Sequence, residues 1–263
     1  MQEKNIQLTK NESNILNYIA DNEISWFLLE DFSKLGFCKL NELKDSLSRL
    51  TQTGHLARPE RAMYCVRNFK NTNLVANILL KNSVIAYWSA MSLHGLTEQI
   101  PNIVYSQSTH RKDDKTVFNV RYKFVKVKPE KMFGSMQMGY GNEAFKVTDV
   151  EKTLLDCFYL PQYSGGYAEL IRAFHSAKLS SVRLLEYGLK MNNLSILKRM
   201  AFLSELFQMK GFTRFQQEVL KRVNQKYTLI DPFGENEGEF NSRWHVRLNI
   251  CRENLLGIIQ KMY

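Results

Sequence analysis

The stretch Leu40–Val66 reads LNELKDSLSRLTQTGHLARPERAMYCV and decides the expected fold of the N-terminal part of the chain. Its first half predicts a helix with one apolar stripe, formed by Leu40, Leu43, Leu47 and Leu50. Gly54 follows the last apolar position, where a glycine often ends a helix. The remainder predicts a small β-hairpin that turns around Pro59-Glu60-Arg61. A polar-faced helix followed by a basic hairpin is typical of a winged helix-turn-helix.

In such a fold the helix enters the major groove of DNA and the hairpin touches phosphate or the minor groove. The predicted DNA-binding residues are Lys39, Asn41, Lys44, Ser48 and Arg49 on the helix, and Arg58 and Arg61 on the hairpin. Asn41 or Ser48 would address base edges, whereas Lys44 and Arg49 would take a guanine edge or a phosphate. A helix and hairpin of this size also occur as a plain structural corner, so the pattern alone leaves that alternative open.

Charge favours the DNA-binding interpretation of this stretch. Residues 33–70 carry eight Lys and Arg against three Asp and Glu, whereas residues 1–32 carry two against six. The positive charge therefore begins where the proposed reading helix begins, as expected of an electrostatic footprint for nucleic acid. The whole chain of 263 residues has a formal net charge of +10, which favours an anionic partner.

Composition narrows the class of protein further. Hydrophobic residues make up 44% of the chain, but no apolar run approaches the roughly 20 residues of a membrane span. The N-terminus, MQEKNIQLTKNES, has no apolar signal-peptide segment, so we expect a cytoplasmic protein without a membrane partner. The four cysteines are scattered without a CxxC pair, which predicts reduced thiols, no metal and no disulfide framework. They are Cys38, Cys65, Cys157 and Cys251.

We expect an α+β protein of two domains, a winged helix-turn-helix over 1–70 and a larger mixed α/β domain over 74–263 that ends in a helical region. The polar run 67–73 is the expected boundary. The second domain would place its strands at about 103–147 and be mostly helical over 148–226. Specific expectations are helices over Asn11–Ala20, Trp26–Leu35 and Leu74–Leu80, and a helical face within 86–101 that Gly95 and then Pro101 interrupt. We also expect one strand with a basic outer face over Val117–Val127 and a capping box from Thr148 to Glu151.

Four blocks together resemble a known family. They are GHLARPERAMYCV (54–66), AYWSAMSLHGLTEQIP (86–101), KVTDVEKTLLDCFYLPQYSGGYAE (146–169) and LIDPFGENEGEFNSRWHVRLN (229–249). Their order and spacing are similar to those of the AbiEi family, the antitoxins of type IV toxin–antitoxin and phage-defence abortive-infection operons, over nearly the whole chain. Family hairpins often have Gly where this chain has Ala62, so the hairpin contacts are less firmly predicted than the helix contacts.

The resemblance implies a bacterial protein with two roles. Its N-terminal domain would bind inverted repeats of double-stranded DNA in its own promoter and act as a transcriptional repressor. Its C-terminal domain would counteract a nucleotidyltransferase-like toxin, without the need for a stable complex. The toxin is implied by the resemblance alone, because composition and spacing do not point to it.

No residue pattern predicts an enzyme or a cofactor. Asp149, Glu151 and Asp156 could form a carboxylate cluster, but capping and other structural roles are the favoured interpretation. His94 beside an apolar helix face is expected to be a core histidine with a satisfied ring nitrogen. His175 and His245 have no partners at metal-ligand spacing.

A second basic stretch lies outside the predicted DNA-binding domain. Residues 172–226 carry eleven Lys and Arg against three Asp and Glu. They are a solvated face, an extension of the DNA footprint, or a surface for an acidic toxin or its RNA substrate. The candidate residues of this second basic surface are Arg172, Arg183, Lys198, Arg199, Lys210 and Arg214.

Two other classes of function remain open at the level of sequence. The winged helix could be a protein-interaction module that never binds DNA, or the chain could be a regulator whose C-terminal domain senses a ligand or partner, with no toxin involved. A nucleotidyltransferase-like reading frame immediately downstream would favour the antitoxin.

Overall fold

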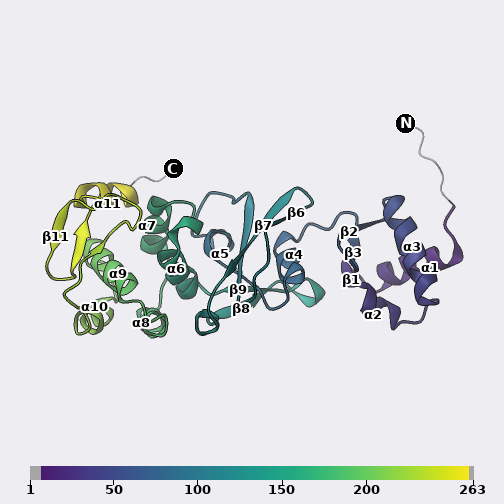
Figure 1. Cartoon of the computed structure of the whole chain (residues 1–263), viewed down its shortest axis with the longest axis horizontal. Helices are drawn as coiled ribbons and strands as arrows, with labels where there is room; N and C mark the ends of the chain where they lie inside the picture. Colours follow the sequence, from purple (N-terminus) through teal and green to yellow (C-terminus); the bar gives the residue numbers. More distant parts are fainter. Residues whose placement is uncertain (1–6, 261–263) are drawn as a thin grey trace.

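A computed structural model describes residues 7–260; residues 1–6 of the polar N-terminal stretch and 261–263 lie outside the described part. The chain is a mixed α/β protein of the α+β kind. It is elongated, with the N-terminal helices at one end, a large sheet in the middle and a mainly helical region at the other end (Figure 1). No helix among residues 7–260 is long and apolar enough to cross a membrane.

The N-terminal unit consists of helices around a small antiparallel sheet with strand order β1-β3-β2. Its elements are α1 (Lys10–Asp21), β1 (Trp26–Leu28), α2 (Leu29–Ser33), α3 (Leu40–Gln52), β2 (Leu56–Glu60) and β3 (Met63–Val66). The prediction of one helix over Trp26–Leu35 is wrong, because the first three of these residues pair with β3. That pairing is long-range, so the local run of apolar residues did not reveal it.

Local signals and packing together form this unit. Thr9 and Glu12 make a capping box at the start of α1. The leucines of α3 pack with Ile15 and Phe27 into one core. Leu40 departs from the predicted stripe, since 48% of its surface is exposed at the first position of the helix.

A mixed six-stranded sheet with order β6-β7-β5-β4-β9-β8 forms the middle of the chain. Its parallel pairs are β5 with β7 and β4 with β9. The strands are β4 (Val84–Ile85), β5 (Ile103–Ser108), β6 (Lys115–Val117), β7 (Val120–Lys126), β8 (Ser135–Met138) and β9 (Phe145–Thr148). The predicted single strand over Val117–Val127 is wrong: Phe118 and Asn119 have φ angles of 50° and 62°, and they form a turn that separates β6 from β7.

Helices flank the sheet and fill the C-terminal end. They are α4 (Thr72–Leu79), α5 (Tyr87–Leu93), α6 (Val150–Tyr159), α7 (Tyr167–Ser176), α8 (Ser181–Lys190), α9 (Leu194–Leu206), α10 (Thr213–Leu220) and α11 (Arg252–Gln260), with short 3-10 turns at Pro129–Lys131, Gly141–Glu143 and Pro161–Tyr163. The C-terminal end also holds a three-stranded sheet, β10-β12-β11, that the sequence did not predict. Its strands are β10 (Thr228–Leu229), β11 (Glu239–Asn241) and β12 (Val246–Leu248).

The predicted capping box at α6 is also wrong. Asp149 is the N-cap residue, and its side chain accepts from the Lys152 amide. Thr148 ends β9 instead, and its hydroxyl bonds that of Thr153 at 2.7 Å. Sheet pairing therefore shifted the helix start by one residue.

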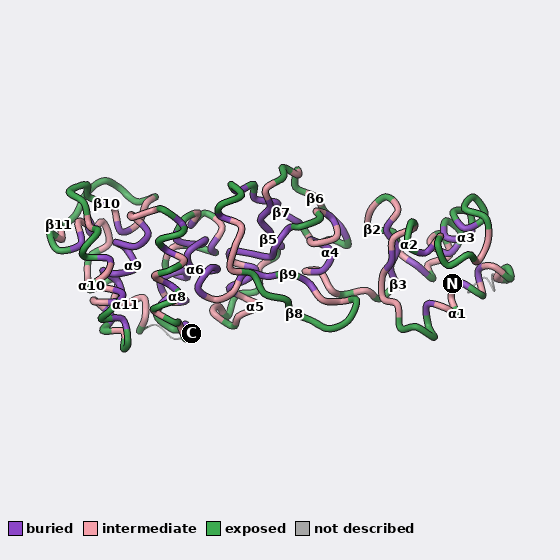
Figure 2. The backbone as a smooth tube through the Cα atoms, turned by 90° about the horizontal axis from the view of Figure 1, so that it is seen from below, coloured by how far each residue is buried: buried purple, intermediate pink, exposed green. Residues whose placement is uncertain are grey.

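Among residues 7–260, three apolar clusters of buried residues lie along the chain, one in the N-terminal unit and two beyond it. Figure 2 shows buried backbone along β9 and α6 and exposed backbone in the connecting loops. The N-terminal unit contacts the middle sheet region directly, since the Trp26 indole donates to the Asn142 carbonyl at 2.5 Å. The side-chain amide of Asn71, the N-cap residue of α4, donates to the Glu143 carbonyl at 3.0 Å, a contact within the larger part of the chain.

Candidate nucleic-acid interface

Helix α3 has one buried face and one exposed polar face. Leu43, Leu47 and Leu50 are at most 1% exposed. Because an α-helix turns by about 100° per residue, their burial directs the intervening polar positions outward. All seven predicted DNA-binding residues are exposed, and together they define the α3–hairpin surface: Lys39, Asn41, Lys44, Ser48, Arg49, Arg58 and Arg61.

An ion pair that the sequence did not predict holds one of these residues. The Arg49 Nε lies 3.2 Å from Oε1 of Glu12, whose side chain is only 2% exposed. The other carboxylate oxygen of Glu12 accepts from the Thr9 amide within the α1 cap. Arg49 itself remains 51% exposed, so its guanidinium both neutralises a buried carboxylate and reaches solvent. The spacing from Thr9 to Glu12 is typical of a helix capping box and could have indicated a structural role for Glu12. No local sequence pattern could have indicated that Glu12 pairs with Arg49.

The hairpin is longer than predicted and turns later. Glu60 pairs with Met63, so the turn consists of Arg61 and Ala62, and a bulge lies between Ala57 and Glu60. Pro59 lies within β2, where the bulge accommodates its missing amide hydrogen. The guanidinium carbon of Arg58 lies 5.7 Å from the centre of the Tyr64 ring, a cation–π distance.

The hairpin also contacts the larger part of the chain. Glu60 accepts a hydrogen bond from the ammonium of Lys115 on β6, and the Lys112 ammonium lies 4.0 Å from the same carboxylate. The Lys115 hydrogen bond lowers the pKa of Glu60 below its ordinary value, against a smaller opposing effect of burial. This contact spans 55 residues of sequence, so no local pattern could have predicted it.

The predicted second basic surface does not exist as one surface, because two of its members are internal. Lys198 is 1% exposed, and its ammonium donates to two backbone carbonyls, of Asn224 at 3.1 Å and Lys226 at 2.6 Å. Arg199 is also buried and donates to the Leu229 carbonyl at 2.8 Å. Helix α9 has nine consecutive buried residues, so charge composition alone could not distinguish internal from surface cations here.

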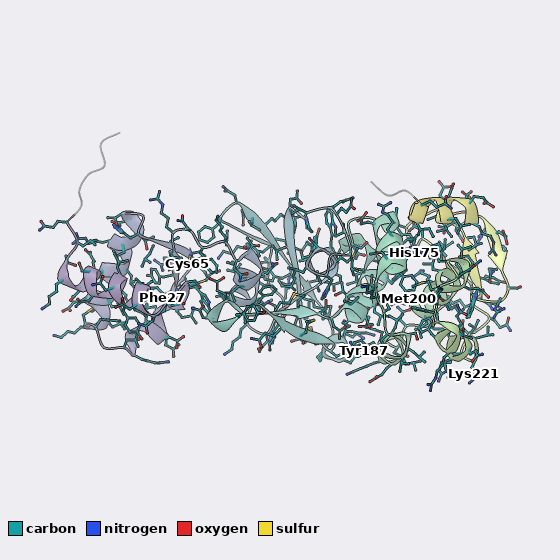
Figure 3. The ribbon with its side chains drawn as sticks, turned by 180° about the vertical axis from the view of Figure 1, so that it is seen from behind. Phe27, Cys65, His175, Tyr187, Met200 and Lys221 are labelled. Atoms are coloured by element: carbon teal, nitrogen blue, oxygen red, sulfur yellow. The ribbon has the colours of Figure 1, made fainter. Side chains whose placement is uncertain are left out.

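The other four residues of the predicted second basic surface differ in their contacts. Arg172 is half-buried and donates to Glu169, whereas exposed Arg183 lies 3.4 Å from Glu151. Lys210 and Arg214 are exposed. These two flank the start of α10, at the opposite end of the molecule from α3 (Figure 1). Figure 3 gives the same separation, with Phe27 and Lys221 labelled near opposite ends of the chain.

Asp156, Glu151 and His94, which we weighed as chemical groups, have structural partners. Asp156 is buried, pairs with Lys152 and accepts from the Gln107 amide at 3.0 Å. Burial raises the pKa of Asp156, and the Lys152 charge opposes that rise. Glu151 accepts from the Ser180 amide at 2.8 Å rather than capping α6. His94 is half-buried, and its ring nitrogen Nε2 lies 2.7 Å from the Thr148 carbonyl, so that nitrogen is satisfied as expected.

Within residues 7–260, no group of three or more His, Cys, Asp or Glu is arranged to hold a metal ion. All four cysteines are free thiols. Cys65 and Cys157 are buried, whereas Cys251 is exposed.

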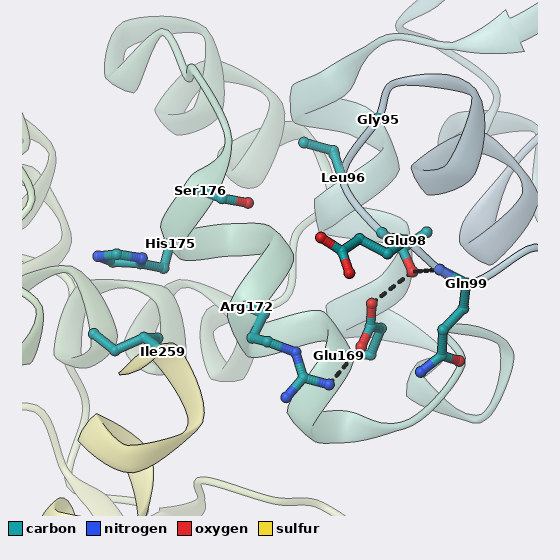
Figure 4. A pocket seen from close by; sticks show the side chains of 10 residues that line it. Gly95, Leu96, Glu98, Gln99, Glu169, Arg172, His175, Ser176 and Ile259 are labelled. Atoms are coloured by element: carbon teal, nitrogen blue, oxygen red, sulfur yellow. Dashed lines mark hydrogen bonds and ion pairs between the residues drawn. The ribbon is translucent and has the colours of Figure 1, made fainter. Parts of the chain in front are cut away.

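A cavity of about 430 Å³ lies away from the α3–hairpin surface, between the loop after α5 and helices α7 and α11. Figure 4 shows Glu98, Glu169 and Arg172 around its polar side, with Ile259 and His175 at the other side. The Thr97 hydroxyl and the Arg172 guanidinium each donate to Glu169 at 2.5 Å. The second and third of the four sequence blocks therefore meet at this cavity.

Comparisons with known proteins bear on the fold. No family model matches the chain, and no curated protein matches it. The crystal structure of the RV2827C protein from Mycobacterium tuberculosis superposes with a TM-score of 0.67 at 14% sequence identity, covering 97% of this chain and 96% of that chain. At this level of identity the likeness concerns the fold alone.

Proposed function

We propose that the chain is a DNA-binding transcriptional repressor of its own operon and an antitoxin that counteracts a nucleotidyltransferase-like toxin. Residues 7–70 would act as a winged helix-turn-helix, with α3 in the major groove and the β2–β3 hairpin as the wing. The rest of the chain would carry the antitoxin activity, in keeping with the resemblance to AbiEi antitoxins.

One observation supports DNA binding above the others. The polar face of α3 is exposed along its length, opposite leucines that are fully buried, and the basic hairpin follows it directly. The cations of this surface come from both elements, with Lys39, Lys44 and Arg49 at α3 and Arg58 and Arg61 on the hairpin. The surrounding stretch has a net charge of +5, from eight Lys and Arg against three Asp and Glu over 33–70.

The experiment is duplex binding as a function of salt, using the upstream region of the chain's own gene as the probe. The double variant Lys44→Ala/Arg61→Ala removes two exposed cations that form no ion pair with any residue between 7 and 260. We expect weaker binding and a salt slope reduced by up to about 0.9 per lost phosphate contact. Arg49 is unsuitable as the first target, because its removal would leave Glu12 buried without its cation.

The matched control is Lys81→Ala/Lys146→Ala, which removes two exposed cations from the larger part of the chain. It changes the net charge equally, so it should leave affinity and slope near those of the wild type. Equal losses in both double variants would indicate a general charge effect and would contradict the placement of the interface. Absence of any salt-sensitive duplex binding would favour a protein-interaction module instead.

The antitoxin role has its own test in cells. The adjacent gene is induced alone, with the full chain, and with residues 74–263. Rescue of growth by the shorter chain would place antitoxin activity beyond the N-terminal unit. Failure of the full chain to rescue would reject the antitoxin proposal and leave a DNA-binding regulator.

The cavity beside Glu169 supports a second candidate, a regulator that senses a small ligand. Its volume of about 430 Å³ lies within the range of small-molecule sites, about 300–1,000 Å³. A metabolite panel screened by thermal shift tests it, with Ser176→Trp as a variant that fills the cavity. A compound that raises the melting temperature of the wild type but not of the variant, and also changes promoter affinity, would establish sensing.

A further inference from the structure

The centre of the exposed face of α3 carries a carboxylate. Asn41, Asp45, Ser48 and Gln52 follow one another at spacings of four, three and four residues, which places them in one row along the helix. All four are exposed. The cations Lys44 and Arg49 lie on the two flanks of this row rather than within it.

Asp45 has no structural partner that would explain its position. No residue from 7 to 260 forms an ion pair or a side-chain hydrogen bond with its carboxylate. Its distance from the helix start also rules out a dipole role, because α3 begins at Leu40 and Glu42 is the acidic residue of the first turn. The carboxylate is therefore solvated at the middle of the surface that we propose for DNA.

A carboxylate in this position cannot face a phosphate, since two negative charges would be brought together. It can accept a hydrogen bond from a base edge in the major groove. Guanine offers only acceptors there, and thymine offers an acceptor and a methyl group. Adenine offers an amino donor beside the N7 acceptor, which would repel the second carboxylate oxygen, whereas cytosine offers its N4 amino donor alone.

We propose that Asp45 is a specificity-determining residue that accepts a hydrogen bond from the N4 amino group of a cytosine in the operator. The inference rests on the proposed DNA-binding function and adds the base that the centre of α3 selects. Lys44 and Arg49, on the flanks, hold the helix against the phosphates on either side of the groove.

The test is selection of binding sites by the full chain from a random double-stranded DNA library, followed by affinity measurements on single-base variants of the selected site. The wild type should select cytosine at one position of each half-site, with a loss on the order of tenfold for other bases. Asp45→Asn should change the preference at that position to adenine, because a carboxamide can donate to N7 and accept from N6. Asp45→Ala should accept all four bases there.

Asp21→Asn is the control, since it neutralises an exposed carboxylate on α1 and changes the net charge equally. It should keep the wild-type consensus. A consensus that is identical in the wild type and Asp45→Asn overturns the assignment of Asp45 while leaving DNA binding intact. A wild-type chain that enriches no sequence and binds duplex without salt dependence overturns both the assignment and the proposed function.

Discussion

Ala62 in the hairpin turn has an unfavourable backbone conformation that a tertiary hydrogen bond stabilises. Ala62 has a φ of 61°, in the left-handed region where a Cβ is disfavoured. Its carbonyl accepts from the Leu29 amide at 2.8 Å, so the turn is held against the start of α2. Ala62 therefore holds a backbone conformation that glycine would adopt at lower cost.

Replacing that alanine should stabilise the N-terminal unit. We expect Ala62→Gly to raise the free energy of unfolding by about 0.5–1 kcal/mol, because the left-handed conformation costs glycine little. Chemical denaturation, followed by a spectroscopic signal that reports on the N-terminal unit, measures this change in the free energy of unfolding. Ala57→Gly in β2, where the backbone is extended, should lower stability instead. A loss of stability in Ala62→Gly would contradict this account of the turn.

Helices of this chain differ in whether their charged side chains face solvent or the protein interior. Helix α9 carries two adjacent cationic residues, as a surface helix often does. The side chains of Lys198 and Arg199 nevertheless point into the interior and donate hydrogen bonds to backbone carbonyls. Burial lowers the pKa of Lys198 below its ordinary value, which is the expected cost of an internal ammonium. The helix thus uses its cations to organise the chain around Asn224 and Leu229 rather than to bind a partner.

This difference predicts two separate outcomes for cation removal. Lys198→Met should lower the free energy of unfolding by about 1.5–3 kcal/mol, because it removes the hydrogen bonds that the buried ammonium donates to the Asn224 and Lys226 carbonyls. Lys210→Ala removes an exposed cation and should change stability by less than about 0.5 kcal/mol. Thermal or denaturant unfolding of both variants provides the measurement. Equal stability of Lys198→Met and the wild type would mean that Lys198 does not support these carbonyls.

At the scale of the whole molecule, the contact between Glu60 and Lys115 joins the hairpin to the middle sheet. It accompanies the contact of Trp26 with Asn142, so both the hairpin and β1 of the N-terminal unit contact the rest of the chain. The orientation of the proposed wing therefore depends on residues far away in sequence.

The Glu60 contact should make this junction sensitive to acid. The pKa of Glu60 is lowered in the folded chain, so its stabilising contribution is present above the ordinary glutamate pKa of about 4.3 and is lost as the pH falls through the lowered value. We expect hydrogen exchange of the β2 and β3 amides to be unchanged between pH 7 and 5, after correction for intrinsic rates, and to accelerate below about pH 4.

Glu60→Gln isolates the contribution of this contact. Since both side chains are about one third exposed, the variant should lose only about 0.5–1 kcal/mol at pH 7 and show a smaller acid-induced change in the hairpin. Glu186→Gln, at an exposed position of α8, should retain the wild-type acid response of the hairpin. An identical acid response in Glu60→Gln and the wild type would exclude Glu60 as its source.

The amino-acid sequence alone determined the features that depend on local periodicity and charge. These are the α+β class, helix α3 with its exposed polar face, and the order of a strand-rich region at about 103–147 before a mostly helical region over 148–226. Only the tertiary structure decided which segments paired across the chain: Trp26–Leu28 became a strand, Phe118 broke a predicted strand, and Lys198 became internal. The physical reason is that the spacing of apolar residues indicates only which face of a helix or strand is apolar. Strand pairing and burial depend instead on contacts between residues far apart in the chain.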